Sequence, residues 1–211
     1  MARRAFLAIA TLAALLSCAP RENLSNAPKP LGQFRLGHNI AIADNVTRGP
    51  FSRDLSETRI EASVQSAVAA RLRRYDGDGL YHLGIVVGGL VLAQPGIPVV
   101  YAPQSVMIAD VTIYDNTTRK KLNAKPKRFT VGEGLQNVVP LLGSGYVRSA
   151  DEQLQNLSAS LARAIEDWLR DNPDWFAPRP GQVRVPYDAR VDAPVIDTTS
   201  TRDVASANSL N

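Results

Sequence analysis

Hydrophobic and polar positions along the chain form four stretches that predict β-strands. Gln33 to Asp44 alternates with a period of two, which is typical of a half-buried strand. Its large apolar residues are expected on one face: Phe34, Leu36, Ile40 and Ile42. Leu80 to Ala93 is apolar, β-branched and marked by glycines, which predicts a long buried strand with a bend or bulge at Gly88-Gly89.

The other two stretches predict a hairpin. Gln104 to Asp115 is the next strand, and Asp115-Asn116-Thr117-Thr118 has the composition of a turn. The return strand begins at Lys120 to Leu122 and is expected to resume at Arg128 to Val131.

Apolar residues recur at helical spacing in two segments, each opened by a capping motif. Asp54-Leu55-Ser56-Glu57 has the D-x-x-E form of an N-terminal cap, and Gly77 stands where a C-terminal cap is expected. Ser149-Ala150-Asp151-Glu152 forms a second capping box, and Asn172-Pro173 ends that helix. The two apolar stripes are Ile60, Val64, Ala67, Val68, Leu72 and Tyr75, and Leu154, Leu157, Leu161, Ala164, Ile165, Trp168 and Leu169.

These elements predict a single α+β domain over residues 33–176. Two helices on one face of a three- to four-stranded, mostly antiparallel sheet would bury both stripes in a two-layer sandwich. Residues 18–32 are polar and rich in proline, which predicts a flexible tether, and Trp175 and Phe176 are expected to pack back on the domain. Residues 177–211 lack a sustained period, which predicts a disordered tail.

The N-terminus has the organisation of a secretory signal. Met1 to Arg4 is basic, and Ala5 to Leu16 is an apolar run that is too short to span a bilayer. We therefore expect residues 1–17 to be a signal peptide. Its removal would take away Arg3 and Arg4, lowering the net charge from +4 to +2, so charge gives no argument for nucleic-acid binding.

Leu15-Leu16-Ser17-Cys18 at the end of this run resembles the lipobox of bacterial lipoproteins. The resemblance implies cleavage between Ser17 and Cys18 and acylation of Cys18, a palmitate-type anchor. Cys18 is the only cysteine, so no disulfide can compete for its thiol. By the sorting pattern of that family, Ala19 in place of an aspartate implies delivery to the outer membrane, with the domain facing the periplasm.

A second resemblance lies in the predicted hairpin. Ile108 to Thr118, followed by Lys121-Leu122, is similar to the central hairpin of transport-auxiliary, curli-secretion-type and uncharacterised envelope lipoproteins. The similarity covers roughly residues 33–171 and rests on element order and one strand motif. It implies a small domain that acts through protein contacts, generally without an active site.

Candidate chemistry is sparse. The only histidines, His38 and His82, each stand alone in a predicted strand, and their spacing matches no metal motif. The glycine pairs around Asp78 and Glu133 lack the third glycine and the lysine of a nucleotide site. Ser144 between two glycines would need one of the histidines as a base to act as a nucleophile. We therefore expect no enzyme, metal or cofactor, with a periplasmic hydrolase as the least favoured reading.

Two segments are candidate contact surfaces. Six cations surround the hairpin: Arg119, Lys120, Lys121, Lys125, Lys127 and Arg128. They could attract anionic headgroups or an acidic partner, or they could form a solvated strand edge that discourages aggregation. The Gly132 to Val147 loop is unusually apolar, which suits either a cap on the core or a partner-facing patch: Leu135, Val138, Val139, Leu141 and Leu142. The sequence thus favours a non-enzymatic accessory or assembly factor of an envelope complex, with a lipid- or glycan-binding module as the alternative.

Overall fold

The structure, a computed structural model, describes residues 24–49, 52–94, 105–132 and 149–188. Over these ranges the chain forms two helices, six strands and a 3₁₀ turn. In chain order they are β1 (Phe34–Ile42), β2 (Thr47–Arg48), α2 (Glu57–Leu72), β3 (Gly79–Val91), β4 (Val106–Asp115), β5 (Lys120–Lys121), β6 (Lys127–Gly132), α4 (Ala150–Arg170) and η2 (Pro173–Phe176).

The strands form one open sheet in which β1, β3 and β4 lie side by side. β4 pairs antiparallel with β3, β5 and β6, whereas β1 and β2 run parallel to β3. The parallel pairing follows from α2, because a helix between two strands returns the chain to the starting end of the sheet. The predicted α+β sandwich with two helices is confirmed. Its sheet has six strands instead of the predicted three to four, and it is mixed, because β1 and β2 pair parallel with β3.

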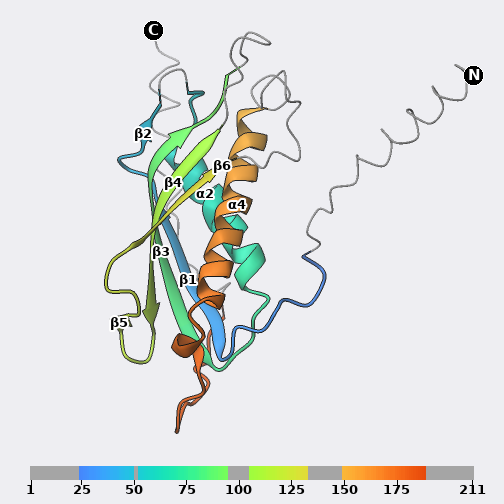
Figure 1. Cartoon of the computed structure of the whole chain (residues 1–211), viewed down its shortest axis with the longest axis vertical. Coiled ribbons are helices and arrows are strands. Elements are labelled where there is room, and N and C mark those ends of the chain that lie inside the picture. Colours follow the sequence, from blue (N-terminus) through green and yellow to red (C-terminus); the bar gives the residue numbers. More distant parts are fainter. Residues whose placement is uncertain (1–23, 50–51, 95–104, 133–148, 189–211) are drawn as a thin grey trace, which may run out of the picture.

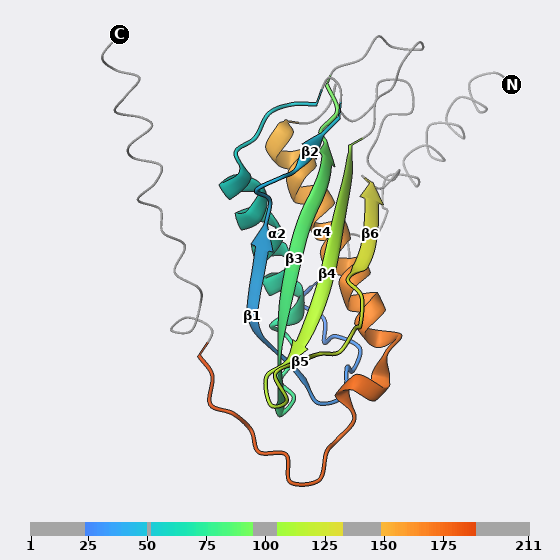
Figure 2. The same ribbon diagram turned by 90° about the vertical axis from the view of Figure 1, so that its left-hand side faces the viewer.

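Both helices cover the same face of the sheet, and Figures 1 and 2 show the opposite face turned away from them. The core between the layers takes the apolar side of each element. Phe176 from η2 is 1% exposed and packs edge-on against Phe34 and Tyr81, which confirms that the segment after α4 folds back on the domain.

The predicted apolar face of β1 is divided between the two sides of the sheet. The pairing of β1 with β3 is shifted between Leu36 and Asn39, so one extra residue enters the strand. Phe34 and Leu36 are buried before the shift, whereas Ile40 and Ile42 are 42% and 43% exposed after it. The prediction that all four lie on one face was wrong, because an odd shift moves every later side chain to the other face.

The predicted irregularity in β3 is confirmed by a register shift between Val87 and Gly89. The capping box at Ser149 is also confirmed: its hydroxyl accepts from the Glu152 amide, and the Glu152 carboxylate accepts from the Ser149 amide.

The predicted N-terminal cap at Asp54 was wrong, because α2 starts after Ser56 and Asp54 pairs with Arg48. Gly77 does not cap α2, which ends at Leu72 with Arg73 as its C-cap. Gly77 lies instead against the start of β1, where a Cβ would come within 2.3 Å of the Gln33 carbonyl carbon.

Parts of both predicted extensions lie against the domain. Leu31 is 5% exposed, and the Gln33 amide donates to the Phe176 carbonyl at 2.8 Å. Beyond η2, Arg179 pairs with the buried carboxylate of Asp115, and Arg184 pairs with Asp76. The sequence predicted flexibility over 18–32 and 177–211, yet residues 24–32 and 177–188 make specific contacts; the remainder of both segments lies outside the described residues.

Candidate functional site

An apolar patch on the face of the sheet opposite the helices is the first candidate for a contact surface. We call this side the outer face. Its exposed large apolar residues come from three strands: Ile40 and Ile42 of β1, Val86 of β3 and Ile108 of β4. Ile42 and Val86 are register partners, so the patch is continuous across β1 and β3. Exposed apolar patches of this kind mark interaction surfaces.

The basic hairpin lies at one end of the same sheet, where β5 and its loop leave β4 (Figure 1). Asn123 holds the loop in shape: it donates to the carbonyls of Val111 and Lys125 and accepts from the Ile113 amide. Arg128 makes two hydrogen bonds to Asp110, at 2.9 and 2.8 Å, and is therefore engaged within the domain. Arg128 is nevertheless exposed, as are the other five cations of the predicted cluster: Arg119, Lys120, Lys121, Lys125 and Lys127.

The remaining predicted contact and anchor residues lie outside the described part of the chain. They are Ser17, Cys18, Leu135, Val138, Val139, Leu141, Leu142 and Ser144.

The two histidines are neighbours, contrary to the expectation that each stands alone. The shift in β1 brings His38 beside His82 of β3, with ring centroids 4.9 Å apart. The His38 amide donates to His82 Nδ1 at 2.8 Å, so Nε2 carries the proton and donates to Asn116 Oδ1 at 3.0 Å. Both ring nitrogens of His82 are therefore engaged in holding strands and turn together.

The electrostatics of His82 agree with this structural role. Burial lowers its pKa, the hydrogen bond to Asn116 acts in the opposite direction, and the His38 ring lowers the pKa further.

Within the described ranges, no group of three or more His, Cys, Asp or Glu side chains is placed to hold a metal ion. In the same ranges no helix has the length and apolar character needed to cross a membrane.

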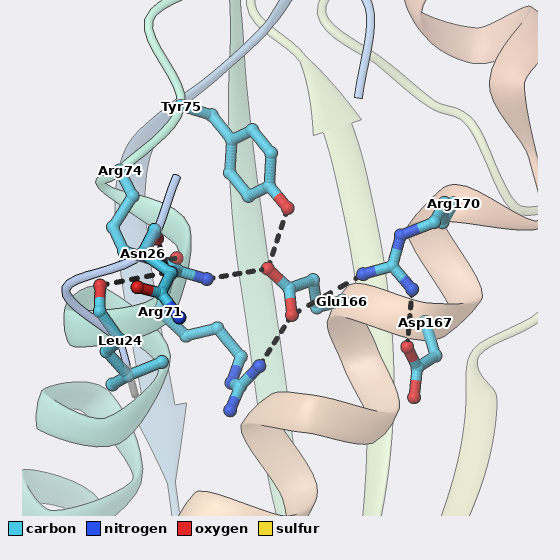
Figure 3. Close-up of polar contacts among 8 residues, drawn as sticks. All are labelled: Leu24, Asn26, Arg71, Arg74, Tyr75, Glu166, Asp167 and Arg170. Carbon is cyan, nitrogen blue, oxygen red and sulfur yellow. Dashed lines mark hydrogen bonds and ion pairs between the residues drawn. The ribbon is translucent and has the colours of Figure 1, made fainter. Parts of the chain in front are cut away.

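A buried carboxylate joins the two helices to the N-terminal segment, as Figure 3 shows. Glu166 of α4 is 3% exposed and accepts from the Tyr75 hydroxyl at 2.7 Å, Arg71 at 2.6 Å and Arg74 at 3.2 Å. Arg170 lies 3.5 Å from the same carboxylate and also pairs with Asp167. We call Glu166 with Arg71, Arg74, Tyr75 and Arg170 the Glu166 cluster.

The Glu166 cluster also fixes the path of the chain before β1. The Arg74 guanidinium donates from Nη1 to the carbonyls of Leu24 and Asn26, both at 3.1 Å, and from Nη2 to Glu166. One planar side chain therefore connects the N-terminal segment to α4. This cluster was not predicted from the sequence, because Arg71, Arg74 and Tyr75 stand 91 to 95 residues before Glu166.

Tyr75 makes the cluster sensitive to alkaline pH. Burial, followed by the hydrogen bond to Glu166, raises the pKa of Tyr75 from 10.0 to about 12. The unfolded chain ionises this phenol first, so the associated stability is complete below pH 10 and is lost as the pH rises toward 12.

We expect the Tyr75→Phe variant to lose less stability than the wild type between these pH values. At neutral pH it should be less stable by about 1.5–3 kcal/mol, because it lacks a hydrogen bond to a charged group. Urea unfolding at a series of pH values measures both effects. The raised pKa of Tyr81 is common to both proteins and cancels in the comparison. Parallel pH profiles would contradict the assignment.

Comparison with known proteins gives structural similarities at low sequence identity. No family model matches the sequence, and no curated protein matches it either. A Caulobacter crescentus CB15 protein provisionally described as a lipoprotein has a TM-score of 0.35 and 14% identity, over 64% of this chain and 93% of that one. A Xanthomonas campestris protein of the DUF330 family has a TM-score of 0.43 and 11% identity, over 70% and 92%. The PelC dodecamer from Paraburkholderia phytofirmans has a TM-score of 0.31 and 11% identity, over 64% and 93%.

Proposed function

We propose that this protein is a lipid-anchored lipoprotein of the bacterial envelope, held at the outer membrane and facing the periplasm. The observation that carries the proposal is the Leu15-Leu16-Ser17-Cys18 motif at the end of an apolar signal segment. Acyl chains on Cys18 would anchor the folded domain, because each buried methylene contributes roughly 0.8 kcal/mol of membrane affinity.

In this proposal the domain acts through protein contacts, as a non-enzymatic accessory or assembly factor of an envelope complex. The outer face of the sheet supports this role with an apolar centre formed by Ile42, Val86 and Ile108. Exposed lysines and Arg119 stand at one end of the same sheet. A partner that fits would present apolar side chains to the centre and acidic side chains to the hairpin.

In-cell crosslinking of the full-length protein tests this function. We expect the wild type to capture a reproducible envelope protein, and the Val86→Asp, Ile108→Asp double variant to lose it. A charge at the centre of an apolar contact must be desolvated without a partner, which is costly. Both positions are exposed, so the fold should be retained, and circular dichroism checks this.

The matched control is the double variant Ala62→Asp, Ser66→Asp, which places the same two charges on the exposed side of α2. It should capture the same protein as the wild type. Equal capture by the outer-face variant would reject the outer face as the contact surface. Capture of lipid or glycan without any protein would replace the accessory role with that of a binding module.

A further inference from the structure

The point where the chain leaves the folded domain is fixed on the helix side. Figure 3 shows Arg74, two residues after the end of α2, reaching both the Leu24 and Asn26 carbonyls. The Arg74 Nε also donates to the Arg71 carbonyl at 3.0 Å, so the guanidinium is held from several sides. In Figure 1 the segment that begins at residue 24 runs beside the helices, on the side away from the outer face of the sheet.

Little chain remains between this point and the anchor. Six residue steps separate Cys18 from Leu24, which span at most about 20 Å when fully extended. Leu31, the first buried residue after Cys18 in the described chain, lies 13 residue steps from Cys18, so a chain held only from Leu31 onward would reach more than twice as far. The Glu166 cluster therefore shortens the segment of chain that connects Cys18 to the folded domain.

A connecting segment of this length restricts the orientation of the domain relative to the membrane. A helix layer packed on a sheet is about 20 Å thick. If the outer face were turned toward the lipid, the segment between Cys18 and Leu24 would have to run around the edge of the sheet and past the thickness of both layers. Six residue steps are too short for that path.

We propose that α2 and α4 face the phospholipid headgroups and that the outer face of the sheet faces the aqueous periplasm. This inference rests on the proposed anchor at Cys18. The helices suit this position because their exposed side chains are small or polar, among them Ala62, Ser66, Ala70, Arg73 and Arg163. Four of the six large exposed apolar residues of the described chain lie instead on the outer face, and the other two, Leu24 and Val183, lie in the segments before β1 and after η2. The helix layer would thus rest on headgroups without inserting, and the contact surface would remain free for a partner.

The test measures which layer lies near lipid. Full-length protein is purified from cells with an azide-bearing amino acid in place of Ser66 on α2 or Thr130 on β6, both of which are exposed. A fluorophore is attached at the azide, and the protein is reconstituted in phosphatidylethanolamine–phosphatidylglycerol vesicles containing a headgroup-labelled quencher lipid. We expect quenching at position 66 and none at position 130, since about 20 Å of protein separates the two surfaces.

An insertion of about 20 Gly and Ser residues after Asn23 is the matched control, since a flexible segment of that length spans roughly 25 Å on average. It should abolish the difference between the two positions. Equal quenching without the insertion, or stronger quenching at position 130, would overturn the orientation. A difference that survives the insertion would overturn the argument that the short connecting segment imposes it.

The orientation can be measured even if the anchor proposal fails. Protein that carries no lipid has a free Cys18 thiol, which can be coupled to a maleimide phospholipid before the same measurement. Fatty-acid labelling of the preparation decides whether cells acylate Cys18, and the quenching pattern decides which layer faces the membrane. Failure of the anchor proposal and failure of the orientation proposal therefore give different results.

Discussion

Replacing Glu166 with alanine should lower the free energy of unfolding by about 3–5 kcal/mol, because it removes one partner of a buried ion pair. The carboxylate is 3% exposed and its main partner, the Arg71 side chain, is 6% exposed. In the variant the Arg71 guanidinium would lose this carboxylate while staying buried, and Tyr75 would lose its acceptor. At about 2–4 °C per kcal/mol for a chain of this size, Tm should fall by roughly 6–20 °C.

Equilibrium urea unfolding of the detergent-solubilised full-length protein measures this effect. An unchanged dependence of free energy on urea concentration would show that stability, and not compactness, has changed. Asp167→Ala is the matched control: it removes a neighbouring carboxylate on α4 that is 56% exposed and pairs with Arg170. That exposed pair should contribute only about 0–1 kcal/mol. Similar losses in the two variants would show that the Glu166 cluster does not stabilise the domain in the way described.

Much of the fold could be predicted because its signals are local. The apolar period of α4 and the capping box at Ser149 lie within one stretch of chain and agree with each other. The irregularity in β3 was visible as two adjacent glycines, Gly88 and Gly89. Where sequence pattern and backbone chemistry point to the same element, the structure contains it.

The outer face illustrates what could not be predicted. Ile40 and Ile42 have the correct spacing for the core, but the shift before Asn39 places Asn39 and Ala41 there instead. No proline or glycine pair resembling that of β3 marks this shift; Gly37 is the nearest feature, and its role becomes clear only beside His82. A Cβ at Gly37 would lie 2.6 Å from the His82 ring, so the glycine makes room for a side chain from a strand 45 positions later.

The Glu166 cluster was missed for a related reason. Glu166 falls between Ile165 and Asp167 near the end of an amphipathic helix, where a charged residue is ordinarily solvated. Its burial depends on Arg71 and Tyr75 arriving from the end of α2. That same packing brings Arg74 to the N-terminal segment, and so a stabilising cluster also determines how much of the predicted tether is free.

Replacing Cys18 with alanine should abolish membrane attachment. The variant would lack the only thiol in the chain, and the shortest acyl anchors already contribute several kcal/mol through their buried methylenes. We expect fatty-acid labelling of cells to mark the wild type and not the variant, and fractionation to move the variant out of the membrane fraction. Ser25→Ala, a small change just beyond the anchor, should label as the wild type does. Equal labelling of the Cys18→Ala variant would exclude Cys18 as the acylated residue, and with it the lipoprotein function proposed for this chain.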